Sequence, residues 1–297
     1  MLLFRLILIL LLSICNTYLF GQKHSSRTRH NADISYHIGP AFFQGDVPSG
    51  IILSTKKVSE IKSYNNNLNF GIGYSNRFHN KFGFKTNLNV LQLCGNDKWG
   101  NSARRAIKFR TYSADLSILI EYSFINWANV NKENYTPHFF ISTGIALFYF
   151  VPLSEYQNKW YSLRELGTEG QGLKPGTKFY SPVSFAIPIN VGYRKRINRR
   201  DTWGAEFCYR NTSTDYIDDV STNYYDNGII AEKRGPAAAY LADPDTRKHK
   251  NGSGRGNPGK HDSYSFINIS YSRTIGLPKH KVHSNKLKWL SPKSNKI

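Results

Sequence analysis

Cysteine is scarce in this chain, and its scarcity limits what can hold the fold together. The 297 residues include three cysteines, Cys15, Cys94 and Cys208. Secreted domains that depend on disulfides usually carry more, so we expect packing and backbone hydrogen bonds to organise this fold. Cys94 is expected near the outer end of its strand and Cys208 in the middle of another, which makes a bridge between them geometrically poor.

Long apolar runs are missing beyond the first 22 residues, which argues against membrane-spanning helices in the rest of the chain. The opening segment MLLFRLILILLLSICNTYLFGQ places Arg5 before an apolar run from Leu6 to Ile14. This layout is typical of a secretory signal peptide. An uncleaved anchor is the alternative, but the run is short for a span of about 20 residues. We therefore expect residues 1–22 to direct export and to be removed.

Acidic residues are half as frequent as basic ones, with 20 Asp and Glu against 40 Lys and Arg and a formal net charge of +20. Such a balance is common in nucleic-acid-binding proteins, but export argues against that function. Much of the excess lies in residues 21–30, 247–261 and 278–297. These stretches are typical of solvated ends and a flexible loop, able to meet anionic lipid headgroups or an acidic protein.

Recognisable catalytic and metal-binding motifs are missing as well. The sequence has no G-x-S-x-G elbow, no H-E-x-x-H pair and no closely spaced histidine and cysteine ligands. His37 has no evident nucleophile near it in the sequence. We therefore expect a protein that is not an enzyme and that has no cofactor, no metal site and no small-molecule substrate.

What the chain does have is alternation of apolar and polar residues with a period of two, the pattern of strands with two different faces. In the last strand the apolar parity shifts between Phe266 and Ile267, as it would at a β-bulge. We predict eight strands, whose apolar faces fall within residues 34–42, 68–74, 82–90, 116–124, 139–151, 183–193, 203–209 and 264–275.

The polar faces of these strands are small and carry few charges, which suits a narrow barrel lumen better than the outer surface of a soluble barrel. We therefore predict an all-β fold, an eight-stranded antiparallel transmembrane β-barrel spanning residues 23–275, with short periplasmic turns and long outer loops. Both termini, including a basic tail at residues 276–297, would then lie in the periplasm. A soluble lipocalin-like barrel is the alternative. The connections alternate between short (79–81, 125–135, 196–201) and long (44–66, 95–106, 153–179, 212–262).

Several charged residues have the parity of the lumen. An unpaired buried charge is strongly unfavourable, so we expect these residues to form compensating pairs, with an ion or proton path as the alternative. An eight-stranded barrel is only wide enough to be filled by side chains or to hold one small ligand. The residues are Arg77, Lys85, Asp115, Glu121, Arg194, Glu206 and Arg210.

The stretch TDYIDDVST begins the longest predicted outer loop and places Asp215, Asp218 and Asp219 close together. A calcium loop would alternate its oxygen ligands and turn on a glycine, and this stretch does neither. The same residue types build Asx and Ser/Thr turns. We therefore expect a rigid, self-hydrogen-bonded loop rather than a metal or acid–base site.

Two stretches resemble the PorG-type outer-membrane proteins of the type IX secretion system. One is LGTEGQG, and the other is TDYIDDVST followed by Tyr224, Tyr225 and Asp226; weaker similarities are YLADPD at 240–245 and RGN at 255–257. The loop after Tyr240 departs from the family in being rich in Lys, Arg and Gly. The motif residues are Leu166, Gly167, Thr168, Glu169, Gly170, Gln171, Gly172, Thr214, Asp215, Tyr216, Asp218 and Asp219.

The resemblance implies a non-enzymatic barrel that associates on its periplasmic side with a ring of PorK and PorN subunits. A structural or adhesive outer-membrane barrel is the alternative function. We expect the acidic stretch to pair with Arg164 or Lys174 of the neighbouring loop. In the tail, Lys286, Lys288, Trp289 and Leu290 combine positive charge with an apolar cluster, which predicts a docking element, with a frayed terminus as the alternative.

Overall fold

The computed structural model describes residues 32–49, 67–79, 81–100, 104–125, 137–198 and 200–275. The chain divides into two units, Met1–His30 and Asn31–Ile297, and every described residue belongs to the second. The predicted signal peptide at residues 1–22 and the predicted tail at 276–297 lie outside the described residues.

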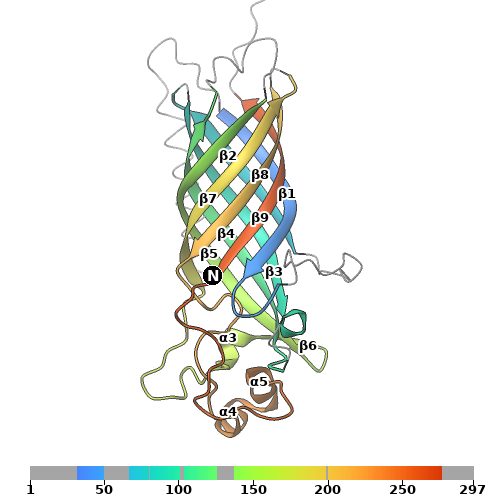
Figure 1. Cartoon of the computed structure of the whole chain (residues 1–297), viewed down its shortest axis with the longest axis vertical. Coiled ribbons are helices and arrows are strands. Elements are labelled where there is room, and N and C mark those ends of the chain that lie inside the picture. Colours follow the sequence, from blue (N-terminus) through green and yellow to red (C-terminus); the bar gives the residue numbers. More distant parts are fainter. Residues whose placement is uncertain are drawn as a thin grey trace, which may run out of the picture. The chain divides into compact units, whose positions relative to one another are not determined.

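Eight antiparallel strands close into a barrel (Figure 1). Neighbours along the chain pair with one another, and the pairing of the first strand with the last closes the cylinder, with Ala32 opposite Ile275. No sheet edge is left between these eight strands, so their backbone polar groups are satisfied within the barrel. The strands are β1 (Ala32–Gln44), β2 (Leu68–Arg77), β3 (Phe82–Asn96), β4 (Lys108–Ser123), β5 (His138–Tyr156), β7 (Val183–Arg196), β8 (Asp201–Thr212) and β9 (Ser263–Ile275).

The pleat of these strands sends large apolar side chains outward, as the alternation predicted. Ile145, for example, is 64% exposed although it lies in the middle of β5. A continuous apolar outer surface is unfavourable in water and favourable in lipid. The exposed strand residues include Ile34, Tyr36, Ile38, Phe70, Ile72, Phe84, Leu88, Val90, Ile118, Ile120, Phe139, Ile141, Ile145, Phe185, Ile187, Ile189, Val191, Phe207, Ile267 and Ile269.

The two ends of the barrel differ. At the end where Ala32 and Ile275 lie, here called the turn end, β2 is followed by β3, β4 by β5 and β7 by β8. Aromatic pairs lie on the outer surface close to it, such as Phe82 with Tyr122, whose ring centroids are 5.2 Å apart, and Trp203 with Tyr271, 5.9 Å apart. Aromatic girdles of this kind mark the borders of a membrane.

Long loops occupy the opposite end, the loop end. The described parts of these loops, residues 45–49, 97–100, 104–107, 157–182 and 213–262, are here called the cap. The cap contains η2 (Asp97–Trp99), β6 (Lys159–Ser162), α3 (Leu163–Leu166), α4 (Asn227–Arg234) and α5 (Pro236–Ala242). The last four are seen beyond the loop end in Figure 1. Across the described ranges, no helix has the length and apolar character needed to cross a membrane.

The last strand corrects one sequence prediction. The pairing of β9 with β8 runs without interruption from Asn211 opposite Ser263 to Asp201 opposite Arg273, so the predicted bulge is wrong. Tyr264 and Phe266 point into the barrel and are fully buried. The parity of the apolar residues changes because aromatic side chains fill the lumen near the loop end. The pairing of β9 with β1 skips Gly39 and Pro40 but keeps its register, with Ile38 opposite Ile269 and Ala41 opposite Phe266, so no residue is inserted.

Candidate functional site: the barrel interior and the cap

The barrel interior is held by compensating charges. Arg210 is fully buried, and its Nε donates to Asp115 Oδ2 at 2.8 Å. Asp115 also accepts from the hydroxyl of Tyr264 at 2.8 Å, and Asn190 accepts from Arg210 Nη1 at 2.9 Å. Hydrogen bonding and pairing together offset the desolvation of these groups.

Three further ion pairs lie nearer the turn end. Lys85 Nζ lies 2.6 Å from Glu206 Oε2, and Arg194 Nη2 lies 2.6 Å from Glu121 Oε2. The third pair joins Arg77 to Asp33, an acid that the sequence analysis did not single out. The prediction that the lumen charges form compensating pairs is therefore confirmed for all seven residues.

Little free space remains among these side chains. The cavity between His37, Lys85, Arg194 and Glu206 measures about 10 Å³, which is room for about one water molecule. Small residues are needed because the lumen is narrow. At Gly192, for example, an added Cβ would come within 2.2 Å of the ring of Phe140. The described interior near the turn end is therefore filled by side chains rather than open as a channel.

Beyond the barrel, the acidic stretch TDYIDDVST is buried inside the cap. Asp218 and Asp219 are both 0% exposed. Asp218 accepts from the backbone N–H of Val47 at 2.9 Å and of Val220 at 3.0 Å. It thus ties the loop after β8 to the loop after β1. Burial is the main cause that raises its pKa well above the ordinary value, and nearby Asp46 adds to the shift.

Asp219 joins the two motif stretches directly. Its carboxylate accepts from the hydroxyl of Thr168 and, at 2.7 Å, from the hydroxyl of Tyr180. Asp219 itself has φ 65°, a left-handed conformation that aspartate tolerates better than most residues. Burial raises the pKa of Asp219 to about 6, against the opposing influence of Arg255, Thr168 and Tyr180.

Glu169 makes a second connection between the same stretches. Its Oε1 accepts from the backbone N–H of Ser221 at 2.9 Å, and its Oε2 accepts from the hydroxyl of Thr222 at 2.6 Å. Arg255 Nη1 donates to Glu169 Oε1 at 3.1 Å and to the carbonyl oxygen of Asp219. We call Thr168, Glu169, Asp219 and Arg255 the Arg255 clasp.

The clasp differs from the sequence expectation in its basic partner. Arg164 donates instead to the carbonyl oxygen of Tyr180 at 2.7 Å, and Lys174 is exposed. The cation paired with Glu169 and Asp219 is Arg255, which is 3% exposed. It belongs to the RGN stretch, one of the weaker similarities, and only that similarity pointed to it.

Glycine is needed in LGTEGQG because the loop turns sharply against its neighbours. Gly167, Gly170 and Gly172 have φ values of 57°, 78° and 76°, a region that favours glycine. At Gly170 an added Cβ would also lie 2.4 Å from the ring of Tyr225. Arg234 of α4 fastens the loop by donating to the carbonyl oxygens of Leu166 and Gln171.

Aromatic rings continue the clasp toward the barrel. Tyr180 stacks on Tyr216 with ring centroids 4.4 Å apart, and it lies parallel to Phe150 of β5 with centroids 6.1 Å apart. Thr111 of β4 donates to the carbonyl oxygen of Ile217 at 2.6 Å. The acidic stretch is therefore anchored to the barrel wall and to neighbouring loops more than to itself, whereas the sequence predicted a self-hydrogen-bonded loop.

Asp215 is the exception within the stretch. It is 7% exposed, and neither of its carboxylate oxygens makes a hydrogen bond of ordinary geometry among the described residues. Burial raises its pKa to about 7, against the opposing influence of the nearby Ser221 hydroxyl, and the charges of Asp46 and Glu169 act in the same direction as burial. In the portion of the chain that the structure describes, no group of three or more His, Cys, Asp or Glu side chains has a geometry that could hold a metal ion.

No protein-family model matches the sequence, and no curated protein matches it either. Among solved structures, the chain is similar to Neisserial surface protein A, with 8% identity, 82% of this chain and 97% of that chain covered, and a TM-score of 0.39. It is similar also to the outer membrane protein OprG from Pseudomonas aeruginosa, with 9% identity, 84% and 97% covered, and a TM-score of 0.40. Ail of Yersinia pestis gives 10% identity, 83% and 99% covered, and a TM-score of 0.35.

Because these identities and TM-scores are low, the class of the protein rests on its own geometry. Closed hydrogen bonding, an apolar outward surface with aromatic borders, and a polar interior together define a transmembrane β-barrel of the outer-membrane type. Its distinguishing feature is the cap, in which LGTEGQG and TDYIDDVST are buried against each other around Arg255.

Proposed function

We propose that the protein is a non-enzymatic outer-membrane barrel component of the type IX secretion apparatus. The observation that supports this proposal is the clasp. The two stretches that resemble PorG-type proteins lie far apart in the sequence, yet Asp219 accepts from Thr168 and Ser221 donates to Glu169. Because the two stretches contact each other directly, they form one structural unit, which explains why both occur in the same chain.

The packed lumen also supports a role other than transport through the barrel. Lys85, Glu206, Arg194 and Glu121 fill the described interior near the turn end as ion pairs. A barrel filled in this way suits a membrane anchor that carries a rigid cap on one side and meets partners on the other.

Deletion of the gene tests the proposal. Proteins that carry the C-terminal signal of the pathway should remain unsecreted in the deletion strain, and secretion should return with the wild-type gene. Normal secretion of these proteins in the absence of the barrel would refute the assignment.

The second part of the proposal concerns partners and orientation. Both termini would lie in the periplasm, and the basic tail with Lys286, Lys288, Trp289 and Leu290 would dock on periplasmic ring proteins of the PorK and PorN type. These residues lie outside the described residues, so the sequence alone supports this part: positive charge beside a compact apolar cluster.

Truncation tests the docking role. Removal of residues 279–297 should leave a folded, heat-modifiable barrel that no longer co-purifies with the ring proteins from detergent-solubilised envelopes. Trp289→Ala should weaken co-purification in part, whereas a matched change in the cap, Trp160→Ala, should not. Wild-type recovery of the ring proteins with the truncated barrel, in moderate salt, would exclude the tail as the docking element.

A structural or adhesive barrel is the second candidate function. Its support is the large cap, whose loops carry exposed basic residues such as Lys174, Arg247 and Lys250. This function would leave secretion intact in the deletion strain and alter envelope integrity or surface attachment, so the same strain distinguishes the two.

A further inference from the structure

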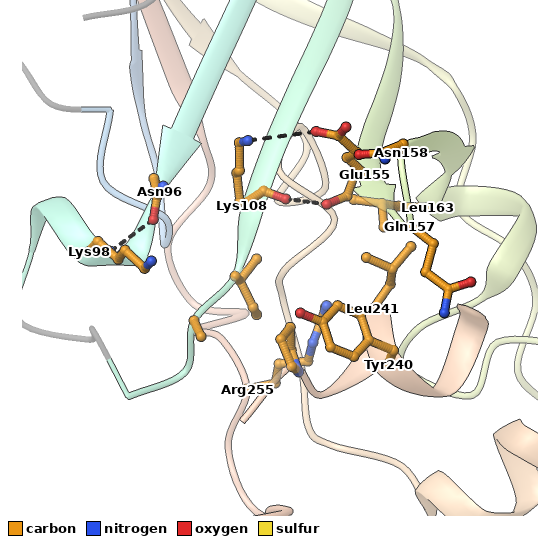
Figure 2. A pocket seen from close by; sticks show the side chains of 14 residues that line it. Asn96, Lys98, Lys108, Glu155, Gln157, Asn158, Leu163, Tyr240, Leu241 and Arg255 are labelled. Atoms are coloured by element: carbon orange, nitrogen blue, oxygen red, sulfur yellow. Dashed lines mark hydrogen bonds and ion pairs between the residues drawn. The ribbon is translucent and has the colours of Figure 1, made fainter. Parts of the chain in front are cut away.

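A pocket of about 370 Å³ opens in the cap beside the Arg255 clasp. Its walls are the loop end of β3 and β4, the hairpin of β5 and β6, and α5 (Figure 2). These are elements from four separate parts of the chain. Three of them continue barrel strands, and Arg255 of the clasp donates to the carbonyl oxygen of Ala242 at the end of α5 at 3.3 Å. A pocket built from rigid walls can select a ligand without first being ordered by it.

One wall of the pocket is an aromatic ring. Tyr240 of α5 is 44% exposed, and its ring lies 4.8 Å from that of Tyr156, centroid to centroid, at the end of β5. Leu241, Ile107 and Leu163 line the pocket near it with apolar carbon. The Tyr240 ring is therefore packed against Tyr156 and still partly exposed, so a ligand could stack on its exposed face.

Amide side chains also line the pocket. Gln157 and Asn158 form the two-residue turn between β5 and β6, with φ values of 51° and 61°. This is the turn type that matches the twist of a two-stranded hairpin. Asn96 at the end of β3 adds a third amide, whose Oδ1 already accepts from the backbone N–H of Lys98 at 3.0 Å. Gln157 and Asn158 each offer both a donor and an acceptor, and Asn96 offers the donors of its NH₂ group. Such a set can meet neighbouring hydroxyl groups on one ligand.

The charges at the pocket are mostly positive. Lys98 is exposed, and Lys108 lies 4.0 Å from Glu155, with both side chains substantially exposed. A pair at that distance in water is weak, so Lys108 remains available to a ligand. Arg255 also lines the pocket, but its charge is neutralised by Glu169 and Asp219. Two lysines against one carboxylate leave a net positive charge.

We propose that this pocket binds a sugar that carries an acidic group, a phosphate or a carboxylate. The C–H face of a pyranose ring packs on an aromatic ring such as Tyr240, and its hydroxyl groups match the amides of Asn96, Gln157 and Asn158. The acidic group is held by Lys98 and Lys108 through charge-assisted hydrogen bonds. The proposal does not depend on a role in secretion, because it rests only on the lining of the pocket.

Binding is tested on the full-length protein in detergent, with glucose 6-phosphate, glucuronate and uncharged glucose as probes and saturation-transfer NMR as the readout. Both acidic sugars should bind in the millimolar range, and glucose about tenfold more weakly, since it lacks the charged contact. Equal signals for the acidic and the neutral sugar would overturn the proposal, as would binding of an acidic peptide but of neither acidic sugar.

Variants locate the site. Lys98→Ala with Lys108→Ala should weaken glucose 6-phosphate binding about tenfold, and Tyr240→Ala should weaken both acidic sugars, whereas Tyr240→Phe should keep the ring and the binding. Lys174→Ala with Lys178→Ala removes the same charge from exposed cap lysines outside the pocket and should change nothing. Equal losses in the two lysine pairs would mean that net charge alone attracts the sugar, and the pocket assignment would fail. Heat-modifiable migration confirms that each variant is folded.

A separate part of the experiment asks whether the natural ligand is a membrane glycolipid or a free acidic sugar. Purified lipopolysaccharide and its delipidated oligosaccharide are compared on wild-type protein and on Tyr240→Ala. If the membrane's own glycolipid is the natural ligand, both should bind and both should depend on Tyr240. If the site serves free acidic sugars, glucose 6-phosphate and glucuronate should bind and the two glycolipid preparations should not. Binding of lipopolysaccharide that does not depend on Tyr240, without binding of the acidic sugars, would overturn the proposal.

Discussion

Arg255 keeps its charge inside the cap because two carboxylates surround it. It lies 3.1 Å from Glu169 and 3.8 Å from Asp219, measured between the nearest charged atoms, and these three side chains are almost completely buried. Because the three side chains are buried, removal of any one of them should strongly destabilise the cap, since it leaves an uncompensated charge shielded from water.

Replacing Arg255 should therefore loosen the cap. Arg255→Leu leaves Glu169 and Asp219 without their cation, at an expected cost of about 3–5 kcal/mol in the stability of the cap. Limited proteolysis should cut residues 213–262 faster, while the barrel band stays intact. Arg247→Leu, the same substitution at an exposed arginine, is the control. Equal protease resistance of Arg255→Leu and wild type would contradict the role of the clasp.

Asp215 should make the cap sensitive to pH. Its pKa of about 7 in the folded cap exceeds the value of about 3.9 expected in the unfolded chain. The folded cap therefore binds the proton more tightly, so the stabilisation from this proton is complete below about pH 4 and is lost as the pH rises through about 7. Asp218, Asp219 and Asp262, whose pKa values are also raised by burial, act in the same direction.

Asp215→Asn should remove part of this dependence. Hydrogen exchange of the amides of residues 213–225, corrected for intrinsic rates, should rise less between pH 5 and pH 8 in the variant than in wild type. Glu232→Gln, at an exposed carboxylate of α4, should behave as wild type. The same pH dependence in Asp215→Asn and wild type would show that this carboxyl does not titrate as the structure indicates.

At the scale of elements, the period-two pattern decides the environment of each strand residue. Ile118 of β4 is outward and exposed, whereas Asn87 of β3 is inward and buried. The same pattern accommodates a change in chemistry along a strand, as in β9, where Tyr264 and Phe266 fill the lumen and Ile267 and Ile269 face outward. The backbone pleat fixes which side chains point inward and which point outward. Apolar residues match the outward positions only along the part of a strand where the outer face meets lipid and the inner face is polar.

Arginine substitutions should separate the two faces. Ile118→Arg places a charge on the lipid face and should cost about 2–4 kcal/mol near the middle of the bilayer. Leu147→Arg on β5 should behave in the same way, while Asn87→Arg should act by crowding the lumen. Urea unfolding in lipid vesicles, followed by heat-modifiable migration, measures the difference. Equal tolerance of all three substitutions would argue against lipid-facing strands.

At the scale of the whole molecule, the barrel should be closed to ions. Lys85 with Glu206 and Arg194 with Glu121 cross the described lumen, and the space among them holds about one water. The purified protein in planar bilayers should show no stepwise conductance at moderate voltage. A Lys85→Ala and Glu206→Ala double variant removes one of these ion pairs, so it should conduct ions more readily than wild type. Steady, stepwise currents from wild type would contradict the packed interior.

The sequence by itself determined the barrel. Strand number, the two faces, the alternation of short and long connections, and the pairing of interior charges all follow from local periodicity and from the cost of an unpaired buried charge. The period-two pattern behind these features depends on residues within about ten positions of one another, so a single sequence was sufficient to predict the barrel. Two details of the strands were wrong. The short strand β6 (Lys159–Ser162) lies in a stretch predicted to be part of a loop, and the bulge near Phe266 was predicted because an apolar side chain was assumed to face lipid when it fills the lumen.

Only the tertiary structure decided how the motif stretches are used. Glu169 and Arg255 are 86 positions apart, and no local pattern indicates which of many loop cations will be buried with a given acid. The predicted partners, Arg164 and Lys174, were chosen because they flank the LGTEGQG stretch, whereas burial selected Arg255. The pocket at Tyr240 has the same origin, since its lining comes from β3, β4, β5 and α5, which meet only because the barrel closes and brings the ends of its strands together.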